Sequence, residues 1–262
     1  MLLKAGAKVA VKPVNGIENR LLSLFRHHCD RMNEGVNAVK LLDIWKIYPP
    51  SEAVLRGVNL EVDIGSFISI RGRSGVGKST LLRIIGLLDE PTEGRVFLLG
   101  NDVSEMNDDE ASKMRLNHIG FVFQFFNLIP SLTVLENIEL PMALAGVKGE
   151  IRKRRAMELL ERFELSKLAD KLPSQLSGGE QQRIAVLRAL ANKPDIILAD
   201  EPTANLDEEN SEILLDLFKE INKEELVTII LTTVSVEEKL PTNHDYFLKI
   251  FRVQPRLHRS QD

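Results

Sequence analysis

Residues 67–80, FISIRGRSGVGKST, decide the fold of this chain. The apolar run FISI is followed by a glycine-rich loop that contains a lysine and two hydroxyls, and then by the helical pattern LLRIIGLL. The loop matches G-x-x-x-x-G-K-[ST] in the strand–loop–helix context that this motif requires. Glycines let backbone N–H groups turn inward around an anion, and the following helix adds the positive end of its dipole. The stretch therefore predicts a phosphate loop and a nucleotide site.

The phosphate loop assigns roles to individual residues. Lys78 can reach the outer phosphates of a nucleotide, and the hydroxyl of Ser79 can ligate Mg²⁺. A purely structural glycine turn is the alternative, and the strand and helix on either side of the loop argue against it. The residues expected to bind the nucleotide here are Gly72, Ser74, Gly75, Gly77, Lys78, Ser79 and Thr80.

The composition is that of an ordinary globular protein. The chain has 262 residues, of which 44% are hydrophobic and 27% charged, and a net charge of −4. These values allow one substantial core and give no electrostatic reason to propose nucleic-acid binding. The sequence has no run near the ~18–20 apolar residues of a membrane-spanning helix, and its start lacks the apolar stretch of a secretory signal. Its single cysteine, Cys29, fits a reducing compartment, so we expect an intracellular protein.

The pattern along the chain divides it into three parts. Residues 1–36 contain a short helical-looking run without a strand partner, so we expect an extension that is loosely attached or that results from a wrongly chosen start codon. Residues 37–251 alternate short apolar runs with helical segments, which is typical of an α/β domain. Residues 252–262 form a tail without an interpretable motif.

A long helical stretch separates the apolar runs HIGFVFQ and DIILAD. Thr133 and Glu136 form a possible capping box, which opens a helix that Pro141 should kink or end. The stretch therefore predicts a helical subdomain at about residues 125–190, inserted into the α/β core. A second amphipathic helix is predicted by apolar residues at helical spacing, namely Ala156, Leu159, Leu160 and Phe163.

Two acidic residues, Asp200 and Glu201, end the apolar run DIILAD. The carboxyl ends of parallel strands share one edge of a sheet, so this pair should lie at the same edge as the phosphate loop. An aspartate there can hold Mg²⁺ through its water shell, and a glutamate can orient or deprotonate an attacking water. A turn-forming acidic pair before Pro202 is the alternative, which the phosphate loop disfavours.

The sequence LSGGEQQR places Ser177, Gly178 and Gly179 at the start of a second helix. Free N–H groups and a hydroxyl at a helix N-terminus suit an anion. Because one nucleotide does not need two phosphate cradles, a dimer is the economical arrangement, with each subunit's second cradle closing over its partner's nucleotide. A plain N-cap is the local alternative.

Taken together, these motifs resemble the ATP-binding cassette family, the nucleotide-binding subunits of ABC transporters. The resemblance covers about residues 38–251 and adds a Q-loop at Gln124 and a D-loop, ANLD, at residues 204–207. It implies an α/β fold: a phosphate-loop NTPase core, an antiparallel β portion and the inserted helical subdomain. The sequences of residues 121–142 and 196–207 resemble those of one branch of the family, which serves lipoprotein release and macrolide export.

The resemblance also implies roles for residues outside the phosphate loop. Gln124 would contact both Mg²⁺ and the attacking water, and Glu201 would be the general base. Mg²⁺ would be held by Ser79, Gln124 and, through water, Asp200. Ser177, Gly178 and Gly179 would complete the partner's site.

Two further residues have local alternatives. Tyr48 matches the aromatic residue on which the adenine stacks, although an aromatic packed at the domain edge is the bland interpretation. Asp207 matches the D-loop aspartate, and an N-cap for the following helix explains it equally well.

One expected residue is missing. The family normally has a histidine that contacts the γ-phosphate after the strand TIILTT, and the aligned residues here are Thr233, Val234 and Ser235. His244 lies ten residues beyond Val234 and is a poor substitute. The predicted loss is one of positioning at the γ-phosphate, which impairs hydrolysis more than ATP binding.

Three interpretations follow. The first is an ATPase that binds ATP and Mg²⁺, pairs with an identical or different cassette, and drives an integral membrane permease from the cytoplasmic face of the cell membrane. The second is an ATP-binding switch or regulatory subunit with little turnover. The third is a soluble ABC ATPase of the translation or DNA-repair type, for which tandem cassettes, a long coiled coil or zinc-binding cysteines would be needed.

Overall fold

The structure, a computed structural model, describes residues 35–50, 52–235, 238–249 and 252–255. The chain divides into two compact units, Met1–Val36 and Asn37–Asp262, and the second is described here by itself. The predicted N-terminal extension, with Cys29, lies outside the described residues except for residues 35 and 36. Of the predicted tail, only residues 252–255 are described.

A six-stranded sheet forms the centre of the second unit, in the order β10-β9-β3-β8-β7-β6. The strands from β9 to β6 are parallel, and β10 pairs antiparallel with β9, so the sheet continues into the segment predicted to be a tail. The strands are β3 (Phe67–Arg71), β6 (Ile119–Val122), β7 (Ile196–Asp200), β8 (Thr228–Thr233), β9 (His244–Lys249) and β10 (Arg252–Pro255).

A second sheet is antiparallel, with the order β2-β1-β4-β5. It supplies the antiparallel portion that the family resemblance implies. Its strands are β1 (Asn37–Tyr48), β2 (Glu52–Asp63), β4 (Glu93–Leu98) and β5 (Asn101–Asp102).

The register of the parallel sheet positions the site. All of β3 and β8 is buried, which is why these strands are near-continuous apolar runs. Arg71 pairs with Thr233, and Thr232 pairs with Asp200. The phosphate loop, the acidic pair and the tip of β8 therefore meet at one edge of the sheet, as the sequence predicts.

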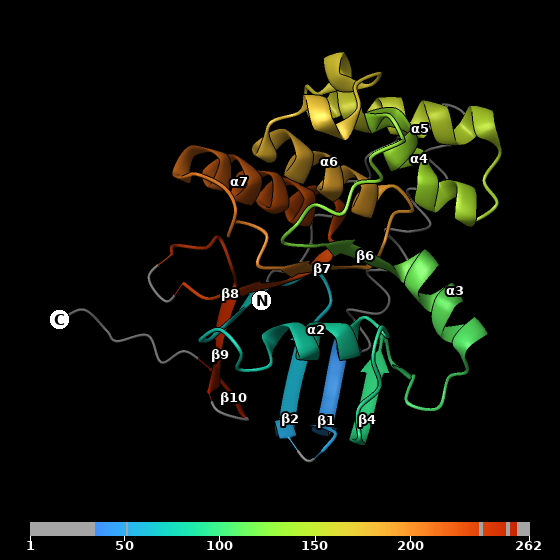
Figure 1. Ribbon diagram of the computed structural model, residues 1–262. Helices are drawn as coiled ribbons and strands as arrows, with labels where there is room; N and C mark the ends of the chain where they lie inside the picture. Colours follow the sequence, from blue (N-terminus) through green and yellow to red (C-terminus); the bar gives the residue numbers. More distant parts are fainter. Residues whose placement is uncertain (1–34, 51, 236–237, 250–251, 256–262) are drawn as a thin grey trace, which may run out of the picture. The chain divides into compact units, whose positions relative to one another are not determined.

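Helices cover both faces of the parallel sheet (Figure 1). Helix α2 (Lys78–Ile85) lies on one face, between the two sheets, while α6 (Gly178–Leu190) and α7 (Glu208–Glu225) lie on the other. The remaining helices are α3 (Asp108–His118), α4 (Val134–Leu144), α5 (Gly149–Arg162) and the short 3₁₀ turns η1 (Ser166–Leu168) and η2 (Pro173–Gln175).

Only helices and loops fill the chain between β6 and β7, as the helical insertion requires. The capping box of α4 is confirmed: Thr133 and Glu136 each accept from the other's backbone N–H. Of the two effects predicted for Pro141, a kink or an end of the helix, the second does not occur, because α4 runs on to Leu144. Proline removes one helical hydrogen bond, and the buried side chains of Ile138 and Met142 on either side keep this segment packed.

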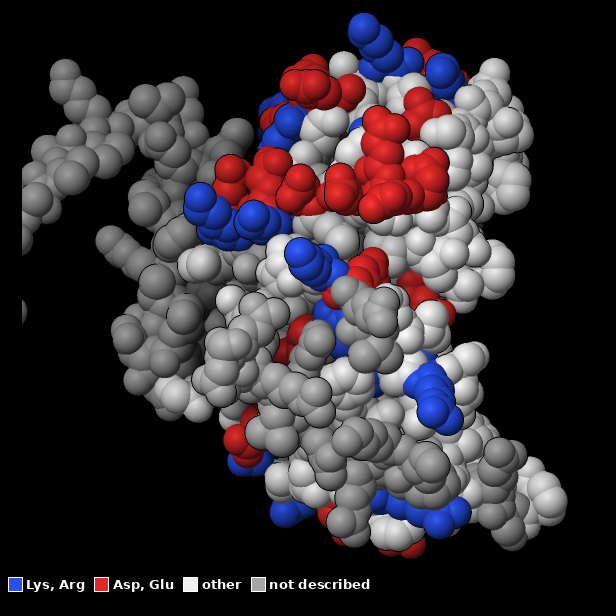
Figure 2. All heavy atoms as spheres, turned by 90° about the vertical axis from the view of Figure 1, so that its left-hand side faces the viewer, with Lys and Arg blue, Asp and Glu red and all other residues white. Residues whose placement is uncertain are grey.

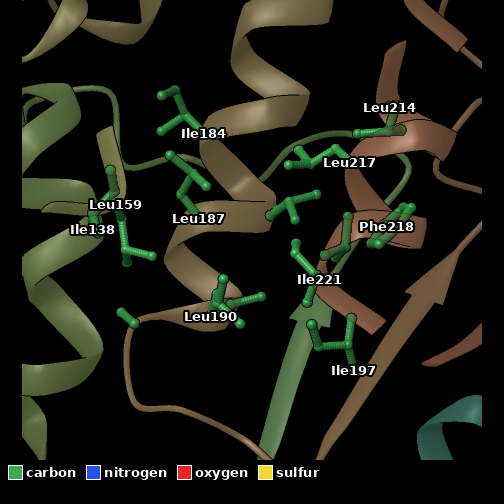
Figure 3. Packing of buried hydrophobic residues seen from close by; sticks show 14 of the residues in the cluster. Ile138, Leu159, Ile184, Leu187, Leu190, Ile197, Leu214, Leu217, Phe218 and Ile221 are labelled. Atoms are coloured by element: carbon green, nitrogen blue, oxygen red, sulfur yellow. The ribbon is translucent and has the colours of Figure 1, made fainter. Parts of the chain in front are cut away.

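A cluster of buried hydrophobic residues joins the helices to the sheet (Figure 3). Leu187 and Leu190 of α6 meet Phe218 and Ile221 of α7, above Ile197 of β7. The opposite face of α7 is acidic, and Figure 2 shows a band of acidic side chains at the height of this helix. No described helix combines the length and apolar character needed to cross a membrane.

Candidate active site

The phosphate loop connects the end of β3 to the start of α2. Gly75 and Gly77 have φ angles of 76° and 103°, in the left-handed region that favours glycine. A Cβ at Gly77 would also lie 3.0 Å from the side chains of Val54 and Leu55, so the loop packs closely on β2. These constraints explain the two glycines and leave the loop backbone open to an anion.

Lys78 is buried at the centre of the site. Its Nζ donates to the carbonyls of Gly72 and Arg73 at 2.9 and 3.2 Å, and it lies 3.0 Å from a carboxylate oxygen of Glu201. The lysine therefore connects the phosphate loop to the acidic end of β7. Such a fixed positive charge can bind the outer phosphates of a nucleotide.

The acidic pair is held by a threonine that the sequence analysis did not assign to the site. The hydroxyl of Thr232 accepts from the backbone N–H of Glu201 at 3.0 Å and donates to the Asp200 carboxylate at 2.6 Å. Glu201 needs this support because its φ angle is 46°, an uncommon value for a residue other than glycine. The signal available in the sequence was a threonine directly after the apolar run of β8.

The structure brings together two of the three residues predicted to hold Mg²⁺. Ser79 and Asp200 line one cavity of about 20 Å³, enough for a single small species. Their hydroxyl and carboxylate oxygens are the hard ligands that Mg²⁺ prefers, so these residues fit the ion. Gln124 is not among the residues lining this cavity; its backbone carbonyl accepts from the Asn205 side chain at 2.9 Å.

Tyr48 lies at the end of β1 and is fixed from both ends. Its hydroxyl donates to Asp89 at 2.6 Å, and Lys46 Nζ lies 4.9 Å from the ring centre and 2.6 Å from the same carboxylate. Partial burial disfavours the charged form of Asp89, but hydrogen bonds from Lys46 and Tyr48 outweigh it and lower the pKa of Asp89. Burial and Asp89 raise the pKa of Tyr48. The ring is thus held in place at the end of β1.

The second anion site predicted from the sequence corresponds to the start of α6. Ser177 is its N-cap and forms a capping box with Glu180, whose pKa is lowered by the hydrogen bond from the backbone N–H of Ser177. A hydroxyl that accepts one hydrogen bond still has its proton to donate, so the cap does not exclude contact with a phosphate. Gly179 is required by packing, because a Cβ there would lie 2.0 Å from the Asn210 side chain.

Asp207 is the N-cap of α7, as its local alternative predicts. Its carboxylate accepts from the backbone and side chain of Asn210 at 2.8 and 2.9 Å, and the backbone hydrogen bond lowers the pKa of Asp207. Because the Asn210 side chain also lies beside Gly179, Asn210 links Asp207 of the D-loop to the start of α6.

Two residues of α6 that the sequence analysis did not assign tie the site together. Gln182 is fully buried and donates to the carbonyls of Phe123 and Pro202, at the ends of β6 and β7. Arg188 donates to the carbonyls of Phe126 and Asn127 in the loop that follows Gln124. These hydrogen bonds attach the loop to α6.

The segment after β8 has no histidine at the site. Val234 stands at the expected position, with 42% of its surface exposed. His244 pairs with Ile68 at the start of β3, whereas the phosphate loop follows the end of that strand. His244 therefore lies at the opposite edge of the sheet, which confirms that it cannot substitute.

A phosphate loop, an acidic strand end and a helical insertion on a parallel sheet define a phosphate-loop nucleoside triphosphatase. A family profile described as ABC transporter matches residues 55–204, more than half of the chain. The chain belongs to this family and is an ATP-binding subunit of the ABC ATPase type. Similarity to transporter components, given below, does not favour the other two interpretations of the sequence, a regulatory subunit with little turnover and a soluble ATPase of the translation or DNA-repair type.

Relatives from the predicted lipoprotein-release and macrolide-export branch are similar to the chain. The lipoprotein-releasing system ATP-binding protein LolD of Aquifex aeolicus is 51% identical over 170 residues, covering 65% of this chain and 76% of LolD. The macrolide export ATP-binding/permease protein MacB of Syntrophobacter fumaroxidans is 46% identical over 203 residues, covering 76% of this chain and 28% of MacB.

Among solved structures, a dimeric post-hydrolysis state of the cassette MJ0796, bound to ADP and Pi, is similar to the chain. MJ0796 comes from Methanocaldococcus jannaschii. The match has a TM-score of 0.77 and 44% identity, covering 85% of this chain and all of the other. The predicted branch and the cassette fold are confirmed.

Proposed function

We propose that the chain binds ATP with Mg²⁺ at the phosphate loop and hydrolyses it with Glu201 as the general base. The observation that supports this most directly is the convergence of Lys78, Glu201 and Thr232-bound Asp200 at one edge of the sheet. Lys78 and the loop N–H groups would hold the phosphates, and Tyr48 would stack on the adenine. Gln124 would approach the site from the loop after β6.

Mg²⁺ bound by Ser79 and Asp200 would offset negative charge on the phosphates. The protein's own contribution is to hold each group in place. Thr232 fixes the Asp200 carboxylate and the backbone of Glu201, so that Glu201 can accept a proton from a water directed at the γ-phosphate.

We further propose that two cassettes close around two ATP molecules and pass this motion to a membrane permease. Ser177, Gly178 and Gly179, with Asp207, would complete the partner's nucleotide site. The dimeric state of MJ0796 supports this arrangement. The permease-bound cassette would lie on the cytoplasmic face of the cell membrane, and co-purification of the tagged chain with a membrane protein from detergent-solubilised cells tests this part.

The test of the nucleotide site is ATP binding and turnover by Lys78→Ala. Loss of the buried cation should weaken ATP binding at least tenfold and remove measurable hydrolysis, by analogy with the loss of a charged hydrogen-bond partner. Lys113→Ala removes an exposed lysine from α3 and is the matched control. Binding of ATP by Lys78→Ala as tight as that of the unchanged protein would refute the assignment.

A further inference from the structure

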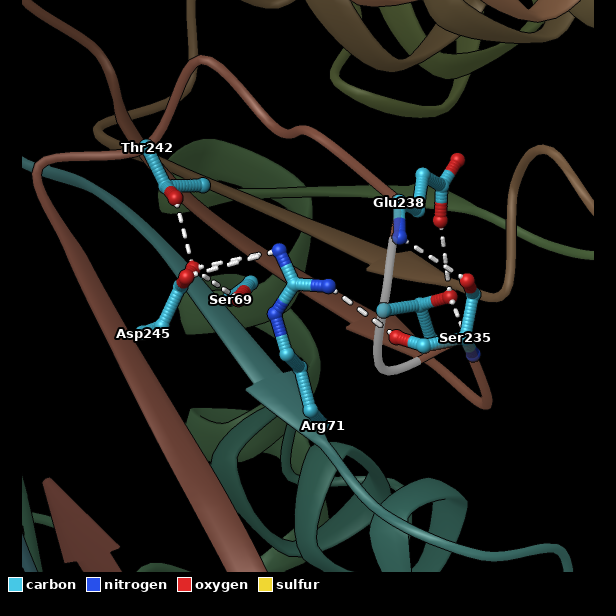
Figure 4. Close-up of polar contacts among 7 residues, drawn as sticks. Ser69, Arg71, Ser235, Glu238, Thr242 and Asp245 are labelled. Atoms are coloured by element: carbon cyan, nitrogen blue, oxygen red, sulfur yellow. Dashed lines mark hydrogen bonds and ion pairs between the residues drawn. The ribbon is translucent and has the colours of Figure 1, made fainter. Parts of the chain in front are cut away.

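Glu238, which lies beyond the tip of β8, bridges two segments of the ATPase site. One oxygen of its carboxylate accepts from the Thr233 hydroxyl at 3.0 Å, and the other accepts from the Thr203 hydroxyl at 3.1 Å. Its backbone N–H donates to the Ser235 hydroxyl at 3.0 Å (Figure 4). The carboxylate thus joins the end of β8 to the turn that follows β7.

This bridge lies beside the candidate base. Glu201, Thr203, Val234 and Glu238 all line one cavity of about 270 Å³. Thr203 belongs to the turn that Glu201 opens, in which the N–H of Ala204 donates to the Glu201 carbonyl at 3.2 Å. Whatever holds Thr203 therefore also restricts the turn on which Glu201 sits.

The other end of the bridge is fixed to the phosphate loop. The carbonyl of Thr233 accepts from the backbone N–H of Gly72 at 3.2 Å. Arg71, which is 1% exposed, donates to the Ser235 carbonyl at 3.0 Å. Arg71 also forms an ion pair with Asp245, as Figure 4 shows. Glu238 consequently ties the Glu201 turn to a part of the sheet that cannot move independently of the phosphate loop.

We infer that Glu238 is a positioning residue for Glu201. Its carboxylate links the ends of β7 and β8 by hydrogen bonds, which the alkyl side chain of Val234 cannot form. This inference rests on the proposed role of Glu201 as the base. Glu201 has a left-handed backbone, so its carboxylate direction depends on the contacts that hold the turn. Glu238 does not touch the reacting atoms; it acts through Thr203.

The experiment compares Glu238→Ala, Glu238→Gln and a matched control, Glu212→Ala, which removes an exposed carboxylate from α7. Glu238→Ala removes both acceptors, and kcat should fall roughly ten- to a hundredfold while the ATP KM and the melting temperature change little. Glutamine can accept from one threonine and donate to the other, so Glu238→Gln should keep kcat within about threefold. The control should be unchanged.

A double variant shows whether Glu238 acts through Glu201. In single-turnover assays, adding Glu238→Ala to Glu201→Gln should lower the residual rate no further, because the positioned group is already gone. If Glu238→Ala does not fold, Thr203→Val removes one arm of the bridge and should lower kcat, with Thr203→Ser restoring it.

Three results would overturn the inference: an unchanged kcat in Glu238→Ala, an equally large loss in Glu238→Gln, or a full additional loss in the double variant. The first would mean that the hydrogen bonds of Glu238 do not contribute to catalysis. The second means that the charge of Glu238 acts directly. Failure of the proposed function looks different, because then Glu201→Gln alone would hydrolyse ATP like the unchanged protein.

Discussion

Lys78 Nζ lies 3.0 Å from Glu201 Oε1, so the lysine proposed to bind phosphate and the carboxylate proposed to activate water are partners in one ion pair. The lysine side chain is 3% exposed and the glutamate 18%. A phosphate oxygen that binds Lys78 must therefore compete with Glu201 for the same Nζ. In the proposed mechanism, this competition would couple ATP binding to release of the base from its ion pair.

Glu201→Gln should separate the two roles. A neutral amide competes less for Lys78, so ATP should bind about three- to tenfold more tightly, the range of a partly buried ion pair. Turnover should fall at least ~100-fold because the base is lost. Isothermal titration with ATP and a steady-state phosphate assay measure the two effects. Weaker ATP binding by this variant would contradict the competition.

Thr232→Val should misplace Asp200 and Glu201 while leaving both carboxylates present. Valine has nearly the shape of threonine but cannot accept from the Glu201 N–H or donate to Asp200. We expect kcat to fall roughly tenfold or more, by misplacement of the base, and the Mg²⁺ concentration for half-maximal activity to rise. Thr232→Ser keeps the hydroxyl and should stay near the unchanged rate. Equal activity of the valine and serine variants would show that the hydroxyl does not act.

The sequence predicts those parts of the site that depend on consecutive residues. The phosphate loop from Gly72 to Thr80 combines a strand, a glycine turn and a helix start, each with its own local signal. Asp200 and Glu201 follow a buried apolar run, and parallel strands bring such ends to one edge. The N-caps at Ser177 and Asp207 are likewise local.

What the sequence could not predict depends on the register between distant strands. Thr232 meets Asp200 because β7 and β8 pair in one particular register, which no local pattern specifies. Gln182 and Glu238 act through side chains that cross between elements. For a related reason Pro141 does not end α4, one of the two effects predicted for it, because packing around Pro141 outweighs the local preference.

Gly179→Ala should disturb the start of α6 for a steric reason that a second change can relieve. A Cβ at this position would lie 2.0 Å from Asn210 Oδ1, so either the Asn210 side chain must leave its hydrogen bonds to Asp207 or α6 and α7 must move apart. We expect the ATPase rate to fall roughly tenfold or more, since small displacements at such sites are costly. The double variant Gly179→Ala with Asn210→Ala removes the clash and should recover part of the rate.

Asn210→Ala alone is the control for this pair, because it loses only the side-chain hydrogen bonds to Asp207. If the double variant is no more active than Gly179→Ala, the glycine matters for another reason, such as a direct approach of phosphate to its backbone N–H.

Replacing Val234 by histidine tests how the chain works without the family's histidine. Because the chain belongs to a family of ATPases, we expect the unchanged protein to hydrolyse ATP well above a Glu201→Gln blank. The specific rate should rise with protein concentration, since the active species is proposed to be a dimer.

Val234 is half-exposed at the rim of the Glu201 cavity, so a histidine has room there. Val234→His should raise kcat by about tenfold or less, because Glu238 and Thr232 already hold the acidic residues. Val234→Ala controls for loss of the alkyl group. A rate for the unchanged protein equal to the blank, with a large gain in Val234→His, would mean that the bridge does not replace the histidine.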